Sequence, residues 1–246
     1  ILGIADKIDS ICGCFSVGLV PTGASDPYAL RRQGIGIVHI MLDKGFSLSL
    51  EELIQTSIGL FGEKSTADTD ELTLKIYTFI QNRISHLLAE EGYAKDVIAA
   101  VVAVSVDDIP NVWNRVSALN SLKAQPDYDL LVAGFKRVGN IIKKSGVSDN
   151  GAELQSVNPD LFEHASEAGL YSAYSEVDGK VSQAMDRGLF DQALREIASL
   201  RTAVDTFFDG VMVMADNADV RDNRLALLGH IAALFGRFAD FSKLSS

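Results

Sequence analysis

The feature that most constrains this chain is the recurrence of apolar residues at helical spacing near its C-terminus. In the segment that ends at Ala215, they recur every three or four positions, at Val204, Phe207, Phe208, Val211, Met214 and Ala215. This spacing predicts one buried face of a helix. The polar residues 216–219 are typical of a turn and of helix N-caps. We therefore expect a last helix from about Val220 to Leu244.

Similar patterns predict helices along the rest of the chain. Their expected ranges are 1–17, 27–43, 50–61, 69–92, 97–104, 111–123, 128–145, 159–187, 188–200 and 201–215. The apolar run 97–104 is also compatible with a strand, but its alanines and helical neighbours favour a buried helix. The polar segment 124–127 contains Pro126 and predicts a domain boundary. The sequence thus predicts an all-α fold, with helical bundle domains at 1–125 and 126–246.

Charge and cysteine content narrow the function. The net charge is −11, and acidic residues outnumber basic ones on both sides of Gln125. Overall charge therefore argues against non-specific nucleic-acid binding, and any RNA contact requires a local basic patch. Cys12 and Cys14 are too close for an ordinary disulfide and favour a reduced, cytoplasmic protein. The four histidines show no metal-ligand spacing, and a lone CxC is a weak metal signal.

The segment 128–145 provides the best candidate for such a patch. Its apolar residues fill one arc of the helix, and the other arc carries Lys136, Arg137, Asn140, Lys143 and Lys144 without an acid among them. This face could bind phosphates. The alternative is a solvated helix whose late cations favour the C-terminal dipole. That alternative explains Lys143 and Lys144 better than Lys136 and Arg137.

Three arginines have two interpretations each. Arg224 falls within the apolar arc of the last helix, where an unpaired charge is costly. It is expected either to pair with an acid such as Asp209 or Glu196, or to contact a phosphate or a base edge. Arg31 and Arg32 lie in a helix that contains two glycines, Gly34 and Gly36, which suggests close packing against another helix. They are expected to form ion pairs there or to contact RNA or another subunit.

Three separated segments carry a resemblance to a known family. Along the chain, these segments are IADKIDSICGCFSVGLVPTGASDPYALRRQGIGIVHI near the N-terminus, FKRVGNIIKKS, and FFDGVMVMADNADVRDNRLALL near the C-terminus. They resemble three segments of one protein, which follow one another in the same order. That protein is the β subunit of bacterial glycyl-tRNA synthetase, the heterotetrameric type. The resemblance implies the end of an HD-like domain and connecting helices, followed by a DALR-type anticodon-binding bundle in the C-terminal part of a longer subunit.

The resemblance also implies the function. It predicts that the chain is the tRNA-binding part of a glycine–tRNA ligase, with tRNA-Gly and the α subunit of an α2β2 heterotetramer as partners. ATP and Mg²⁺ would be used by the whole enzyme, with no cofactor and no catalytic residue in this part. The predicted contacts are Lys136, Arg137, Asn140, Lys143 and Lys144 for the anticodon-stem backbone, and Arg221, Asn223 and Arg224 near the bases.

Two other functions remain open on the sequence. The chain could be a non-catalytic helical scaffold for subunit assembly, which predicts exposed apolar patches. It could also derive from an HD phosphohydrolase, because Asp6 resembles the aspartate that closes a metal site in HD domains. That chemistry needs upstream histidines and an adjacent His-Asp pair, and neither precedes Asp6 here. A capping or paired carboxylate is therefore the better interpretation of Asp6.

Overall fold

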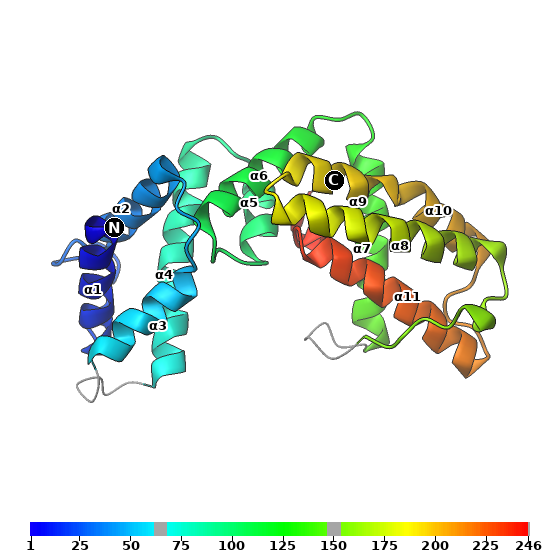
Figure 1. Cartoon of the computed structure of the whole chain (residues 1–246), viewed down its shortest axis with the longest axis horizontal. Helices are drawn as coiled ribbons and strands as arrows, with labels where there is room; N and C mark the ends of the chain where they lie inside the picture. The colour runs from blue at the N-terminus through cyan, green and yellow to red at the C-terminus, as the bar shows by residue number, and fades with distance from the viewer. Residues whose placement is uncertain (62–67, 147–153, 246) are drawn as a thin grey trace. The chain divides into compact units, whose positions relative to one another are not determined.

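The computed structural model describes residues 1–61, 68–146 and 154–245, and their secondary structure is helical (Figure 1). Within these ranges, β-structure is limited to an isolated bridge between Thr22 and Ser25. The predicted all-α fold is therefore confirmed. The helices are α1 Leu2–Ser16, α2 Leu30–Lys44, α3 Leu50–Phe61, α4 Thr69–Glu90, α5 Lys95–Val102, α6 Ile109–Lys123, α7 Tyr128–Ser145, η2 Pro159–Leu161, α8 Ala165–Asp186, α9 Phe190–Ser199, α10 Arg201–Gly210, α11 Ala218–Gly236 and η3 Phe241–Lys243.

The contacts divide the chain into two compact units. Unit 1 comprises Ile1–Ile98 and Ser105–Asn114, and unit 2 comprises Ala99–Val104 and Arg115–Ser246. The predicted domain boundary after residue 125 stays a prediction, since this division follows contacts alone. Each unit has its own set of fully buried apolar side chains.

Unit 1 is built from α1 to α4, with α1 packed against α2, α3 and α4. The buried face of each helix follows its apolar spacing, as Ile11, Ile37, Ile54 and Ile80 are all fully buried. The segment before α6 contacts the start of α3 through Asp107. The backbone N–H of Leu50 donates to the Asp107 carbonyl, and the backbone N–H of Glu51 donates to the Asp107 carboxylate. A side chain distant in sequence thus caps this helix.

Unit 2 contains α7 to α11. The helix α11 packs against α7 and α8, and α8 packs against α9 and α10 (Figure 1). Leu227, Leu228 and Ile231 of α11 are fully buried. Asn217 caps α11 through a 3.0 Å hydrogen bond from the backbone N–H of Asp219, in agreement with the predicted turn at 216–219.

Several predicted helix ends differ from the structure. The helix α2 starts at Leu30 rather than at Pro27, because Ala29 has a φ of 55° and the Asp26 carboxylate caps the N–H groups of Leu30 and Arg31. The predicted helix 159–187 is divided: η2 and an extended segment precede α8. The last helix ends at Gly236, and Phe241 is buried in η3 beyond it.

The helix α10 also ends early, at Gly210, and Val211 is extended. Met214 is 57% exposed, so the prediction that it belongs to the buried face was wrong. The cause lies at Gly210, where an added Cβ would lie 2.6 Å from the ring of His164. The close approach of another segment therefore overrides the helical spacing of the apolar residues that follow.

Candidate nucleic-acid interface

The cationic face predicted on 128–145 forms one side of α7, whose bounds match the prediction. On the other side, Phe135 packs into an aromatic cluster, with ring centroids 4.1 Å from Phe235 and 4.7 Å from Phe241. Gly146 ends the helix in the left-handed conformation at φ 73°, as glycine at this position commonly does. Burial of the apolar side fixes which residues of α7 face outward.

The outward residues are accessible. Arg137, Asn140, Lys143 and Lys144 are exposed and Lys136 is half-buried. Among the described residues, none of these four cations lies within ion-pair distance of a carboxylate. The α7 face, which we define as these five residues, therefore carries positive charge that the described part of the chain does not neutralise.

Arg137 is held in place by an aromatic contact. Its guanidinium carbon lies 4.1 Å from the ring centroid of Phe208 on α10. Stacking over a ring leaves the edge of a guanidinium, with its N–H donors, available to a phosphate. A stacked arginine also loses less side-chain entropy when it binds, since its position is already set.

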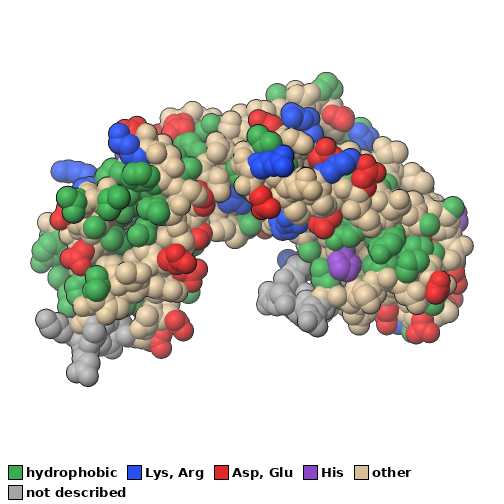
Figure 2. Space-filling view, in the orientation of Figure 1, with side chains coloured by type: hydrophobic (Ala, Val, Ile, Leu, Met, Phe, Trp, Pro, Cys, Tyr) green, Lys and Arg blue, Asp and Glu red, His purple; other side chains and the backbone are tan. Residues whose placement is uncertain are grey.

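Other cations of unit 2, unlike those of the α7 face, form ion pairs with described carboxylates. Lys180 lies 2.6 Å from Glu176, Arg201 lies 3.4 Å from Asp127, and Arg237 lies 3.1 Å from Asp178. Figure 2 shows positive and negative side chains intermixed over α8 and α9. Opposite charges at such distances largely cancel toward solvent, so these cations attract a polyanion less than unpaired ones do.

Arg224 occupies a buried ion pair in unit 2. Its side chain is 7% exposed, and its Nε donates a 2.8 Å hydrogen bond to Glu167, whose side chain is 1% exposed. Further bonds run from its Nη atoms to the Met212 carbonyl at 3.0 Å and to Glu163 at 3.3 Å. The expectation of an acidic partner is confirmed, but the named partners Asp209 and Glu196 were wrong.

Glu167 is ionised because its partners outweigh its burial. Burial by itself raises the pKa of Glu167, whereas the hydrogen bond from Arg224 and the backbone N–H groups of His164 and Glu163 lower it, and the resulting pKa lies below the ordinary value. The same hydrogen bond raises the pKa of Arg224 against the effect of its burial. Glu167 also completes a capping box with His164 at the start of α8.

Asn223 and Arg221, the other two residues predicted near the bases, also make contacts within unit 2. Asn223 clamps the backbone of Asn158: its Oδ1 accepts from the N–H at 2.7 Å and its Nδ2 donates to the carbonyl at 3.0 Å. Arg221 is half-buried and donates to the Ala215 carbonyl at 3.4 Å. Among the described residues, no hydrogen bond or ion pair joins either side chain, or Arg224, to the α7 face. Their base contacts remain a prediction.

Sequence reasoning missed the acidic partners of Arg224. Glu163 and Glu167 precede it by about one quarter of the chain, and they fall in a stretch that was predicted to be continuous helix. One local signal was present, since His164 and Glu167 have the spacing of a capping box. That signal predicts a helix start at Ala165, the position at which the buried Glu167 side chain faces Arg224.

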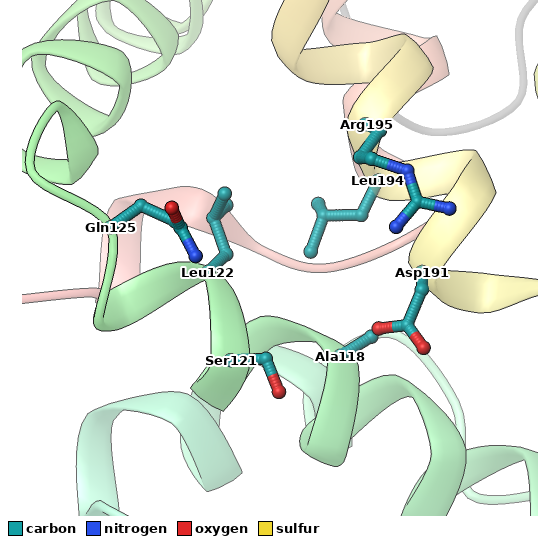
Figure 3. A pocket seen from close by; sticks show the side chains of 7 residues that line it. All are labelled: Ala118, Ser121, Leu122, Gln125, Asp191, Leu194 and Arg195. Carbon is teal, nitrogen blue, oxygen red and sulfur yellow. The ribbon is translucent and has the colours of Figure 1, made fainter.

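Unit 2 also contains a hollow of about 290 Å³ between α6 and α9. Leu122 and Leu194 point toward one another across it, and Asp191 and Arg195 line its edge from α9 (Figure 3). Ser121 and Gln125 also line the hollow, but the Ser121 hydroxyl donates to the Ser117 carbonyl of its own helix at 3.0 Å rather than to Asp191. The lining therefore does not show a nucleophile hydrogen-bonded to a base. Over the residues 1–61, 68–146 and 154–245, no group of three or more His, Cys, Asp or Glu side chains could hold a metal ion.

These features define a class of protein. The described residues are all-α, and the α7 face carries cations that no described carboxylate pairs with. The comparison with known families agrees, since residues 131–238 match the DALR anticodon binding domain. None of the described helices combines the length and the hydropathy that a membrane span requires.

The comparisons also identify the family. Residues 1–103 match the family described as glycyl-tRNA synthetase beta subunit. The glycine–tRNA ligase beta subunit of Desulfatibacillum aliphaticivorans is 52% identical over 246 residues, which is 100% of this chain and 35% of the relative. Those of Citrifermentans bemidjiense and Geobacter metallireducens are each 44% identical, over 99% and 100% of this chain and 34% of each relative. The chain therefore belongs to the glycyl-tRNA synthetase β-subunit family, and it spans about a third of the length of these relatives.

Proposed function

We propose that this chain is the tRNA-binding part of a glycine–tRNA ligase β subunit and that the α7 face holds the backbone of the tRNA-Gly anticodon stem. The observation that carries the proposal is the positive charge of α7, with which no carboxylate of residues 1–61, 68–146 and 154–245 forms an ion pair, in a chain of net charge −11. The match of residues 131–238 to an anticodon-binding domain supports it. Backbone contacts of this kind set the position of a nucleic acid but do not read its sequence.

In this proposal, the chain serves an enzyme whose chemistry lies elsewhere. The α subunit, in an α2β2 assembly in the cytoplasm, would use ATP and Mg²⁺ to join glycine to the tRNA that this chain holds. The names of the relatives support the ligase and imply an α subunit. Arg221, Asn223 and Arg224 would lie near the bases. Their polar groups also contact the segments before α8 and α11 and the first turn of α8.

A triple variant tests the proposal. Lys136, Arg137 and Lys143 are replaced together by Ala, and the control replaces Lys180, Arg201 and Lys243, which lie in the same unit but are paired with acids. Both variants lose three positive charges. We expect the α7 variant to lose affinity for tRNA-Gly in a gel shift and the control to lose little. Equal affinity of both variants would remove the α7 face from the proposal.

A scaffold for subunit assembly is the second candidate, and one observation favours it. Unit 1 exposes large apolar side chains, including Leu60 at 79% and Leu74 at 65%. Figure 2 shows hydrophobic side chains gathered on the visible side of α1 and α2. The scaffold predicts that the chain binds the α subunit and shifts neither tRNA-Gly nor a non-cognate tRNA. The gel shift with both tRNAs therefore separates the two functions.

A further inference from the structure

The hollow between α6 and α9 has no role in the proposed function. Its volume of about 290 Å³ lies at the lower end of the range for small-molecule sites, which is about 300–1,000 Å³. Its floor is apolar, because Ala118 and Leu194 are buried and Leu122 is half-buried. Leu122 and Leu194 extend toward each other from the two helices (Figure 3). A hollow of this size and lining fits one small ligand that has an aliphatic part.

Two opposite charges lie at the edge of this floor. Asp191 and Arg195 are exposed and lie one turn apart on α9, a spacing that places Cβ atoms about 5–6 Å from one another. Glu176 and Lys180 have the same spacing on α8 and pair at 2.6 Å. Within residues 1–61, 68–146 and 154–245, the side chains of Asp191 and Arg195 make neither an ion pair nor a hydrogen bond. Both charged groups are therefore available to a ligand.

Gln125 completes the polar edge from the opposite wall. It follows α6 directly, and Figure 3 shows its side chain across the hollow from α9. Within the described part of the chain, its side-chain amide makes no hydrogen bond, so a donor and an acceptor remain free there. A few polar groups around an apolar floor are typical of small-molecule sites, in which the polar groups set the orientation of the ligand.

The two charges select a ligand that carries both signs. The Arg195 guanidinium can donate two parallel hydrogen bonds to a carboxylate, and the Asp191 carboxylate can accept from an ammonium group. An α-amino acid bears both groups on one carbon, which matches an acid and a cation one helical turn apart. We propose that the hollow binds a free aliphatic α-amino acid, with its carboxylate at Arg195 and its ammonium group at Asp191. The aliphatic side chain lies on the floor formed by Leu122 and Leu194.

Equilibrium dialysis of the whole chain against radiolabelled L-leucine tests this site. Three competing ligands separate the contributions of the amino acid. Glycine lacks the aliphatic side chain, L-leucinamide lacks the negative charge, and N-acetyl-L-leucine lacks the positive charge. Each ligand thus removes the group that one part of the hollow is proposed to bind.

Three variants remove the matching parts of the protein. Arg195→Gln and Asp191→Asn each remove one charge, and Ser121→Leu keeps both charges but fills the hollow from an exposed position on α6. The matched controls are Arg187→Gln and Asp186→Asn. They change exposed residues at the end of α8 that do not line the hollow.

We expect L-leucine to bind more tightly than glycine, by about 4-fold for each CH₂ group that the floor covers. Arg195→Gln should weaken L-leucine binding by about 10-fold and leave the affinity for L-leucinamide unchanged. Asp191→Asn should weaken L-leucine binding and leave the affinity for N-acetyl-L-leucine unchanged. Ser121→Leu should abolish the binding of all three leucine ligands, and both controls should match the wild type.

Equal affinities for L-leucine and glycine, or leucine binding that persists in Ser121→Leu, would overturn the site. Equal affinities for L-leucine, L-leucinamide and N-acetyl-L-leucine would overturn the proposed ligand class. Circular dichroism checks that each variant folds, and if Ser121→Leu does not, the matched losses in Arg195→Gln and Asp191→Asn decide. The α7 triple variant tests the proposed function separately, because it changes none of the residues that line the hollow.

Discussion

The buried pair of Arg224 and Glu167 allows a quantitative prediction about unit 2. Replacing Glu167 by Ala leaves the Arg224 guanidinium 93% buried with only the partly exposed Glu163 as an acidic partner. Breaking one side of a buried pair costs about 3–5 kcal/mol. The change also removes the acceptor of the N–H groups of Glu163 and His164, at about 1 kcal/mol each. We therefore expect about 5–7 kcal/mol of destabilisation.

Urea unfolding monitored by circular dichroism measures this loss directly. The matching double-mutant cycle replaces Arg224 by Met, alone and together with Glu167→Ala, so that the coupling of the two side chains is separated from the loss of the helix cap. The double variant should be more stable than the sum of the two single changes predicts. If Glu167→Ala costs less than about 1 kcal/mol, or if the two changes add without coupling, the reasoning about this pair is refuted.

Two further predictions concern the same unit. The pKa of Glu167 is lower in the folded chain than in the unfolded one. Its contribution to stability is therefore fully present above the unfolded carboxyl pKa of about 4.3 and is lost as the pH falls through the lower folded value. When thermal unfolding is followed from pH 7 downward, Glu167→Gln should lose less stability on acidification than the wild type, and equal losses would contradict the ionised state of Glu167. Gly210→Ala should destabilise by about 1–3 kcal/mol, because its Cβ would lie 2.6 Å from His164. Gly139 lies in the middle of α7, and a Cβ added there would have no described atom of another segment within 4 Å. Gly139→Ala should therefore stabilise the chain by about 0.5–1 kcal/mol. A loss of stability would contradict the open space around this position.

The sequence predicted best where one strong pattern acts locally. The bounds of α7 follow from a clear apolar arc and from Gly146 just after it, and α3 begins and ends where its spacing places it. The cationic face of α7 follows from the same pattern, because burying one arc exposes the other.

The sequence predicted poorly where the deciding contact is distant along the chain. The end of α10 depends on the packing of Gly210 against His164, and the partner of Arg224 depends on a capped helix start 57 residues upstream. The half-buried position of Trp113 also depends on a separate segment, since its indole N–H donates to Glu91, 22 residues away, at 3.0 Å.

The central claim is that the α7 face holds the backbone of tRNA-Gly, and hydroxyl-radical footprinting of the tRNA tests it most directly. The whole chain should protect the sugar–phosphate backbone of the anticodon stem. The variant with Lys136, Arg137 and Lys143 changed to Ala should lose that protection, and the variant with Lys180, Arg201 and Lys243 changed should keep it. Anticodon-stem protection that persists in the α7 variant would contradict the account.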